Sequence, residues 1–176
     1  MNDLTSSMER LEMIAFFGGY PLLYFVIHFV AGNQLKRTIL KNRLITLLPL
    51  AYALVGTLYL GLQLKDWYPD YNIKHIASGF QYPYLKIWGL LSLIFWIPPL
   101  FKKPVFSLLH SLVFFFLLIQ DLYVQFFSSA ADKHIIKNDM KVYTDSLLLN
   151  LLSFVVVSVI YFLLVRFRNK KNSVRN

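Results

Sequence analysis

The sequence predicts an all-α fold: an integral membrane helical bundle of about five transmembrane helices, with its N-terminus outside and its C-terminus inside. Three observations lead to this prediction, namely the apolar composition, the lengths of the apolar runs and the distribution of charge. Of the 176 residues, 57% are hydrophobic and only 15% are charged, whereas a soluble domain carries about 25% charged residues. A chain this short cannot bury so much apolar surface in one small core, and the same apolar excess excludes disorder.

Cysteine and several catalytic motifs are missing from the chain, and their absence excludes several classes of protein and of active site. There is no cysteine, which excludes disulfide frameworks, thiolate-ligated metal centres and thiol catalysis. The chain also lacks an HExxH motif, a glycine-rich phosphate loop and a Ser-His-Asp order. We therefore expect a protein that is not an enzyme.

Five apolar runs approach the length of a membrane span, for which about 20 mostly apolar residues are needed. They cover residues 13–32, 44–63, 82–101, 104–127 and 146–165. The sequence contains no internal repeat and no low-complexity tract, so we expect one membrane domain over residues 1–176.

The third run is the marginal one. Pro98 and Pro99 are expected to end its helix early, because a proline disfavours helical geometry in the residue before it and supplies no N–H. A helix that starts at Pro83 then has about 15 residues and a length of roughly 22 Å. Such a helix either crosses the bilayer obliquely or re-enters on the same side. The short turn at Lys102-Lys103 predicts an antiparallel hairpin with the fourth run.

Charge decides between these two alternatives. With the N-terminus outside, the segments expected in the cytoplasm are 33–43, 102–103 and 166–176, and they hold eleven basic residues and no acidic one. The other seven basic residues and all nine acidic residues lie in outer segments or at helix ends. This is the positive-inside distribution, and it requires the third run to cross. The distribution also explains the net charge of +9, so nucleic acid is not expected as a partner.

Residues 131–143, between the fourth and fifth runs, have an amphipathic pattern. Lys133, Lys137 and Lys141 recur every four residues, while apolar side chains line another side. This spacing predicts a short helix that lies on the outer surface of the bilayer. Asp145, just before the fifth run, is placed to act as its N-cap.

Polar residues inside the apolar runs are informative because they are costly in a bilayer. At 100° per residue, five polar residues of the fourth run fall within an arc of about 100°; they are Ser107, His110, Ser111, Asp121 and Gln125. Such a stripe faces protein or water rather than lipid. It either joins helices through hydrogen bonds or forms a ligand, ion or proton site.

Two histidines lie at similar depths on different helices. His28 follows Tyr24 by four residues on one face of the first helix. It lies about 6 Å from the inner end of its helix, and His110 about 9 Å from the inner end of its own. Two such imidazoles can ligate a haem axially or hold a metal, or they can bond to tyrosine and serine neighbours. No further ligands are evident at that depth, so we predict no metal and no cofactor, with haem as the open alternative.

A motif-like stretch lies in the middle of the chain. It comprises Phe80-Gln81-Tyr82-Pro83-Tyr84-Leu85, then Gly89-Leu90-Leu91, then Ile97-Pro98 before a short basic turn. An aromatic-Pro pair, a central glycine and a terminal proline at these positions resemble the DoxX-like small membrane proteins. The resemblance covers roughly residues 44–165, and the usual Lys after the glycine is absent, with Ser92 nearby instead. It implies a small polytopic membrane fold, in a family where some members are linked to quinone-dependent redox partners, and it assigns no site residue.

These patterns favour a non-enzymatic multi-pass protein that acts as an accessory, scaffold or regulatory subunit through helix–helix contacts. Its expected partners are the lipid bilayer and either a second copy of the chain or another membrane protein. Two alternatives stay open: a redox or ligand-binding protein that uses His28 and His110, and a small oligomeric transporter or pore lined by the polar stripe. Acid–base chemistry by Asp121 and Asp145 is the remaining catalytic alternative. The expected location is the cell membrane, taken as a bacterial inner membrane.

Overall fold

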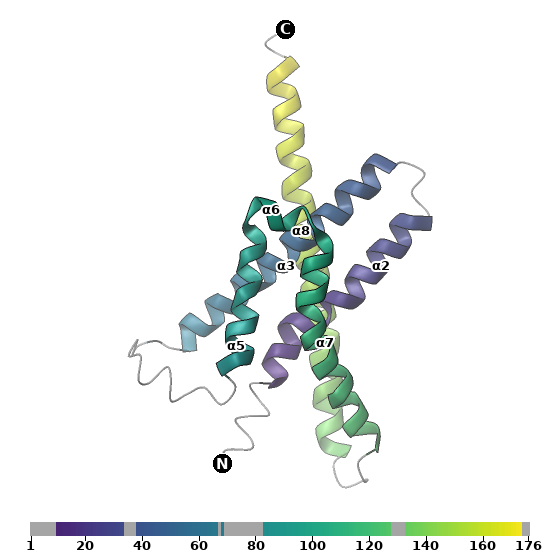
Figure 1. The fold of residues 1–176 in the computed structure, drawn as a ribbon, viewed down its shortest axis with the longest axis vertical. Coiled ribbons are helices and arrows are strands. Elements are labelled where there is room, and N and C mark those ends of the chain that lie inside the picture. The colour runs from purple at the N-terminus through teal and green to yellow at the C-terminus, as the bar shows by residue number, and fades with distance from the viewer. Residues whose placement is uncertain (1–9, 34–37, 67, 69–82, 128–132, 174–176) are drawn as a thin grey trace.

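A computed structural model describes residues 10–33, 38–66, 68, 83–127 and 133–173 (Figure 1). Within these ranges the chain is helical and contains no strand, so the predicted all-α fold is confirmed. The elements, in chain order, are η1 (Ile14–Gly18), α2 (Tyr20–Asn33), α3 (Thr38–Asp66), α5 (Pro83–Leu90), η2 (Leu91–Trp96), α6 (Pro98–Phe101), α7 (Pro104–Phe127) and α8 (Lys133–Ser173).

Four helices in the described part of the chain are long and apolar enough to cross a membrane. They are Arg10–Val30, Asn42–Asp66, Pro104–Tyr123 and Lys141–Arg168, and they correspond to four of the five predicted runs. The remaining run gives the shorter apolar helix Pro83–Trp96.

The short helix ends where the two prolines predict. Ile97 has extended backbone geometry, with φ −75° and ψ 128°, because it precedes Pro98. Its second part, η2, is a 3₁₀-helix, which rises about 2.0 Å per residue rather than the 1.5 Å of an α-helix. Residues 83–96 therefore extend over roughly 24 Å, slightly more than the same residues in α-helical geometry.

The first apolar run contains a break that the sequence analysis does not predict. Ile14–Gly18 form a π-helical turn, and the regular helix resumes at Tyr20. Pro21 explains the wider turn, since it donates no N–H and its ring clashes with the carbonyl of Phe17 in regular α-helical geometry. Side chains of α8 bond to backbone groups of this turn, as described below.

The fifth run is part of a much longer helix than predicted. Residues 131–132 lie outside the described residues, but from Lys133 onward the expected surface segment continues without a break into the apolar run. No glycine or proline lies between Lys133 and Ser173 to end the helix. The segment 133–143 is therefore the first part of α8 and not a separate helix, and Asp145 lies inside α8 instead of capping it. At 1.5 Å per residue, the 41 residues of α8 extend about 61 Å.

The helices cross one another around an aromatic core. In Figure 1, α3 crosses α8 near the middle of the molecule. Buried rings from three helices meet there: the centroids of Phe17 and Phe114 are 4.7 Å apart, and those of Tyr20 and Tyr52 are 4.4 Å apart. The upper part of α8 extends beyond the other helices.

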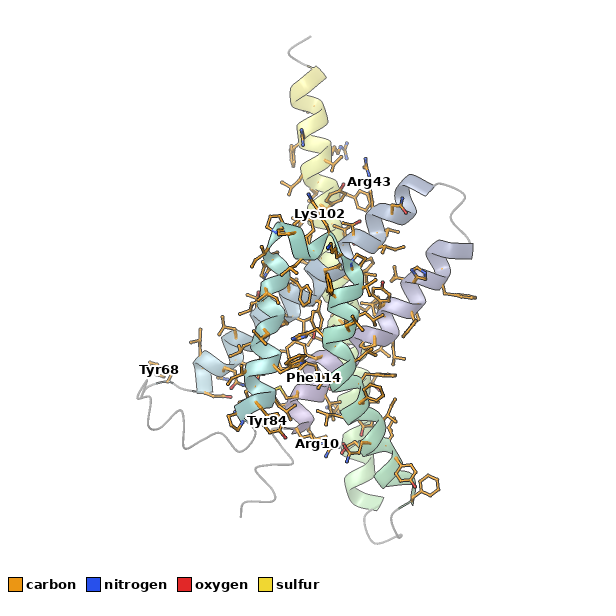
Figure 2. All side chains as sticks on the ribbon, viewed as in Figure 1. Arg10, Arg43, Tyr68, Tyr84, Lys102 and Phe114 are labelled. Atoms are coloured by element: carbon orange, nitrogen blue, oxygen red, sulfur yellow. The ribbon has the colours of Figure 1, made fainter. Side chains whose placement is uncertain are left out.

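The labelled side chains of Figure 2 lie toward two ends of the bundle. In Figure 2, Arg43 and Lys102 are directed toward one end, while Tyr68 and Tyr84 lie toward the other. Arg10 lies at the second end as well, where it forms an ion pair with Asp121.

Candidate functional site

The most elaborate polar arrangement in the described structure surrounds His110 on α7. Its Nδ1 lies 2.8 Å from the hydroxyl of Tyr52 on α3. On the other side, the indole of Trp88 on α5 stacks on the imidazole, with centroids 4.8 Å apart and planes 4° from parallel. The Trp88 indole N–H also donates to the backbone carbonyl of His110, at 3.1 Å. His110 therefore joins three helices.

Aromatic rings enclose the imidazole almost completely, and only 9% of His110 is exposed. Phe95 contacts it edge-on at 5.8 Å, and Phe114 lies 6.2 Å away. The second ring nitrogen, Nε2, is buried and has no hydrogen-bond partner within the described residues. A buried polar atom without a partner lowers the stability of a protein by about 1–3 kcal/mol. Nε2 is therefore the ring nitrogen of His110 that remains able to bind a ligand.

The two serines of the predicted stripe are also buried and point into the protein. Ser107 Oγ donates to the carbonyl of Pro104 at 2.8 Å, and it lies 2.7 Å from the hydroxyl of Tyr20. Because a serine hydroxyl has one proton, Tyr20 is the donor in the second bond. Ser111 Oγ donates to the carbonyl of Leu108. Both hydroxyls are thus used in bonds within the chain.

The outer members of the stripe lie in a different environment. Asp121 accepts a hydrogen bond from the hydroxyl of Tyr143 at 3.2 Å, and its other oxygen lies 3.4 Å from Nη2 of Arg10. The side chain of Gln125 lies outside the described residues. Asp145 is exposed, and the structure places no contact between it and Asp121 among the residues that it describes.

His28 and His110 are not brought together. His28 is exposed, and its ring stacks on that of Tyr24, with centroids 6.2 Å apart and planes 7° from parallel. Tyr24 is 7% exposed and contacts Tyr20, so other rings lie between the two histidines. Within the described ranges, no group of three or more potential ligands is arranged to hold a metal ion.

Ser146 and Asn150 on α8 bond to the first helix, a pairing that the sequence does not predict. The hydroxyl of Ser146 accepts from the amide of Gly19 at 2.9 Å and donates to the carbonyl of Ile14 at 2.8 Å. Asn150, one turn later on α8, donates to the carbonyl of Phe16 at 2.9 Å. These two side chains therefore tie the π-helical turn to α8, and bonds from neighbouring helices are how membrane helices tolerate such breaks. Pro21 is the sequence feature that could have indicated such partners, because a proline inside a helix leaves a carbonyl one turn before it without its usual donor.

Glycine makes this contact between helices possible. A Cβ added at Gly19 would lie 2.8 Å from backbone atoms of Ser146 and Leu147. No other residue type fits at this position without separating the first helix from α8. The close approach through glycine is typical of helix pairs in membranes.

Comparisons of the chain with protein-family models, curated protein sequences and solved structures found no match. The resemblance to DoxX-like proteins therefore stays a prediction.

Proposed function

We propose that the chain is a multi-pass protein of the cell membrane that acts, without catalysing a reaction, as an accessory, scaffold or regulatory subunit. In this proposal five helical segments cross the bilayer, with the N-terminus outside and the C-terminus in the cytoplasm. The partner is a second copy of the chain or another membrane protein, bound through helix–helix contacts.

The path of the third segment supports five crossings. Residues 83–96 extend over roughly 24 Å, and the hydrocarbon core of a bilayer is about 30 Å thick. The segment lies beside α7, to which Trp88 is bonded, and α6 connects the two at the end where Lys102 is directed. With Lys102 and Arg43 at one end, the positive-inside rule favours that end as cytoplasmic.

The use of the intramembrane polar groups supports a structural role. Ser107, Ser146 and Asn150 are bonded to groups of their own chain. Polar side chains that join helices in this way stabilise a bundle. Because these polar groups are used in bonds within the chain, they favour the scaffold over the pore.

The observation that carries the proposal is the poor coverage of α8. Lys141–Arg168 has the highest mean hydropathy of the four long helices, 2.6, yet only 17% of its most apolar stretch is buried. Its upper half presents large apolar side chains over an arc of about 180°: Val155, Val156, Val159, Ile160, Leu163 and Leu164. This surface is available for lateral contact with another helix.

A site-specific photo-crosslinker tests this proposal. Placed at Ile160, it is expected to produce one discrete protein adduct in native membranes, of the mass of a second copy or of one other membrane protein. The matched control is Phe116 on α7, which is 65% exposed and lies outside the proposed surface. Lipid adducts alone at Ile160, with the same pattern at Phe116, would contradict the proposal.

A second candidate function rests on the unpartnered Nε2 of His110. A ligand-binding or redox role would use this nitrogen, alone and not together with His28. Purified protein from haem-replete cells would then have a visible Soret band that is lost in His110→Ala. A colourless preparation would exclude the haem version of this candidate.

A further inference from the structure

A groove of about 490 Å³ lies on the side of the bundle, between the first helix, α7 and α8. Gly19 and Leu118 are lining residues that are buried. Leu22, Leu147 and Leu148 line it as well and are 38–51% exposed, so the groove opens toward the surroundings of the bundle.

The lining is suited to a hydrocarbon chain. Apart from Tyr143 and Thr144, the residues that line the groove are glycine and leucine. Apolar side chains favour hydrocarbon over polar groups, so the acyl chain of a membrane lipid suits this lining.

The chemistry along α8 changes from basic to apolar as the helix enters the groove. Lys137, Lys141, Thr144, Leu148 and Leu151 follow one another at intervals of four, three, four and three residues, which places them along one stripe of the helix. The last three line the groove, and the exposed Lys141 lies one turn beyond its polar end.

Asp145 is an acidic neighbour of this stripe. It follows Lys141 by four residues and lies about 40° around the helix from it, on the side away from Thr144, which is about 100° from Asp145. Asp145 therefore flanks Lys141 on the side that faces away from the groove. Asp121 is engaged by Arg10 and by Tyr143. The order from Lys141 into the groove is thus cationic and then apolar, which matches the order of phosphate and acyl chain in an anionic phospholipid.

We propose that this groove binds one phospholipid with an anionic headgroup. Its acyl chain lies against Leu148 and Leu151, and its phosphate is held at Lys141. This lipid site rests on the membrane location proposed above, because the groove must lie in the bilayer. It goes beyond the scaffold role. The failure of one proposal can be told apart from the failure of the other, because lipid binding and association with a partner helix are measured in separate experiments.

Native mass spectrometry of the full chain in detergent tests the proposal, with dioleoyl phosphatidylglycerol and dioleoyl phosphatidylcholine as probes. The unmodified chain is expected to bind the anionic lipid about fivefold more tightly, the effect of one lysine near a membrane surface. Lys141→Gln removes this preference, whereas Lys170→Gln, at an exposed site near the other end of α8, leaves it unchanged.

A second pair of variants tests the groove itself. Leu148→Trp fills the groove and is expected to weaken binding of both lipids about tenfold, because the indole takes the space of the acyl chain and the chain then buries less apolar surface. Leu152→Trp is the control: Leu152 is 53% exposed, against 51% for Leu148, and is not among the lining residues. Glycerol phosphate distinguishes a lipid site from a site for a free anion, and it is expected not to compete.

Three results would overturn the proposal. The first is equal binding of the two lipids by the unmodified chain. The second is unchanged lipid binding in Leu148→Trp. The third is displacement of phosphatidylglycerol by glycerol phosphate. The lysine variants change only exposed positions and are expected to fold. They therefore test the preference for the anionic lipid even if a tryptophan variant does not fold.

Discussion

The hydroxyl of Tyr52 lies 2.8 Å from Nδ1 of His110, and this contact joins α3 to α7 in the aromatic core. Both residues are buried. In an apolar environment neither group has water as an alternative partner, so the bond is expected to contribute to stability and to fix the orientation of the imidazole under Trp88.

Tyr52→Phe is expected to lower the free energy of unfolding by about 1 kcal/mol, because it removes one hydrogen bond and leaves Nδ1 of His110 unsatisfied. Reversible unfolding in mixed detergent micelles measures this change. Tyr123→Phe is the control, since Tyr123 is 62% exposed. Equal stability of the two variants would show that the Tyr52–His110 bond contributes nothing.

Ser146→Ala is expected to cost about 1–2 kcal/mol, because the amide of Gly19 and the carbonyl of Ile14 both lose a hydrogen bond to α8. Ser158→Ala, on the same helix, is the matched control. The hydroxyl of Ser158 is buried without a partner among the described residues, so its removal is neutral or stabilising. The same unfolding measurement applies, and a cost at Ser158 as large as at Ser146 would contradict this explanation of the π-helical turn.

Gly19→Ala is expected to destabilise the bundle, because the new Cβ would lie 2.8 Å from the backbone of Leu147, which cannot move without α8. Gly61→Ala, in α3, is the comparison. Nothing lies within 4 Å of a Cβ at Gly61, so alanine is expected to stabilise that helix by up to about 1 kcal/mol. Thermal unfolding of both variants should therefore shift in opposite directions, and a shift in the same direction would contradict the packing.

Asp121→Asn is expected to cost less than about 1 kcal/mol, because the pair with Arg10 is partly exposed and its oxygen–nitrogen distance is 3.4 Å. Salt screens such a pair, so the difference from the unmodified chain should shrink at high ionic strength. Unfolding at low and high salt measures this dependence. A loss of several kcal/mol that does not respond to salt would assign Asp121 a larger role than the structure gives it.

Much of the fold follows from local sequence patterns. Apolar length predicts the four long helices, and Pro98 with Pro99 predicts the end of the third segment, because both depend on residues close together in the chain.

The features that could not be predicted depend on distant residues. The length of α8 is one example: charged residues from Lys133 to Lys141 suggested a boundary, but nothing in that stretch interrupts helical hydrogen bonding. The partners of His110 are another, because Trp88 and Tyr52 are ordinary apolar positions until the helices pack. For the same reason the similar depths of His28 and His110 gave no information about their separation around the bundle.

Labelling of single cysteines tests the central claim, five crossings with the basic ends in the cytoplasm, most directly. The chain contains no cysteine, so Tyr68→Cys, Lys102→Cys and Lys170→Cys, all at exposed positions, each carry one thiol. In right-side-out vesicles a membrane-impermeant maleimide is expected to label Tyr68→Cys alone, and the other two variants only after permeabilisation. Labelling of Lys102→Cys together with Tyr68→Cys in sealed vesicles would contradict the claim, because the third segment would then return to the side from which it entered.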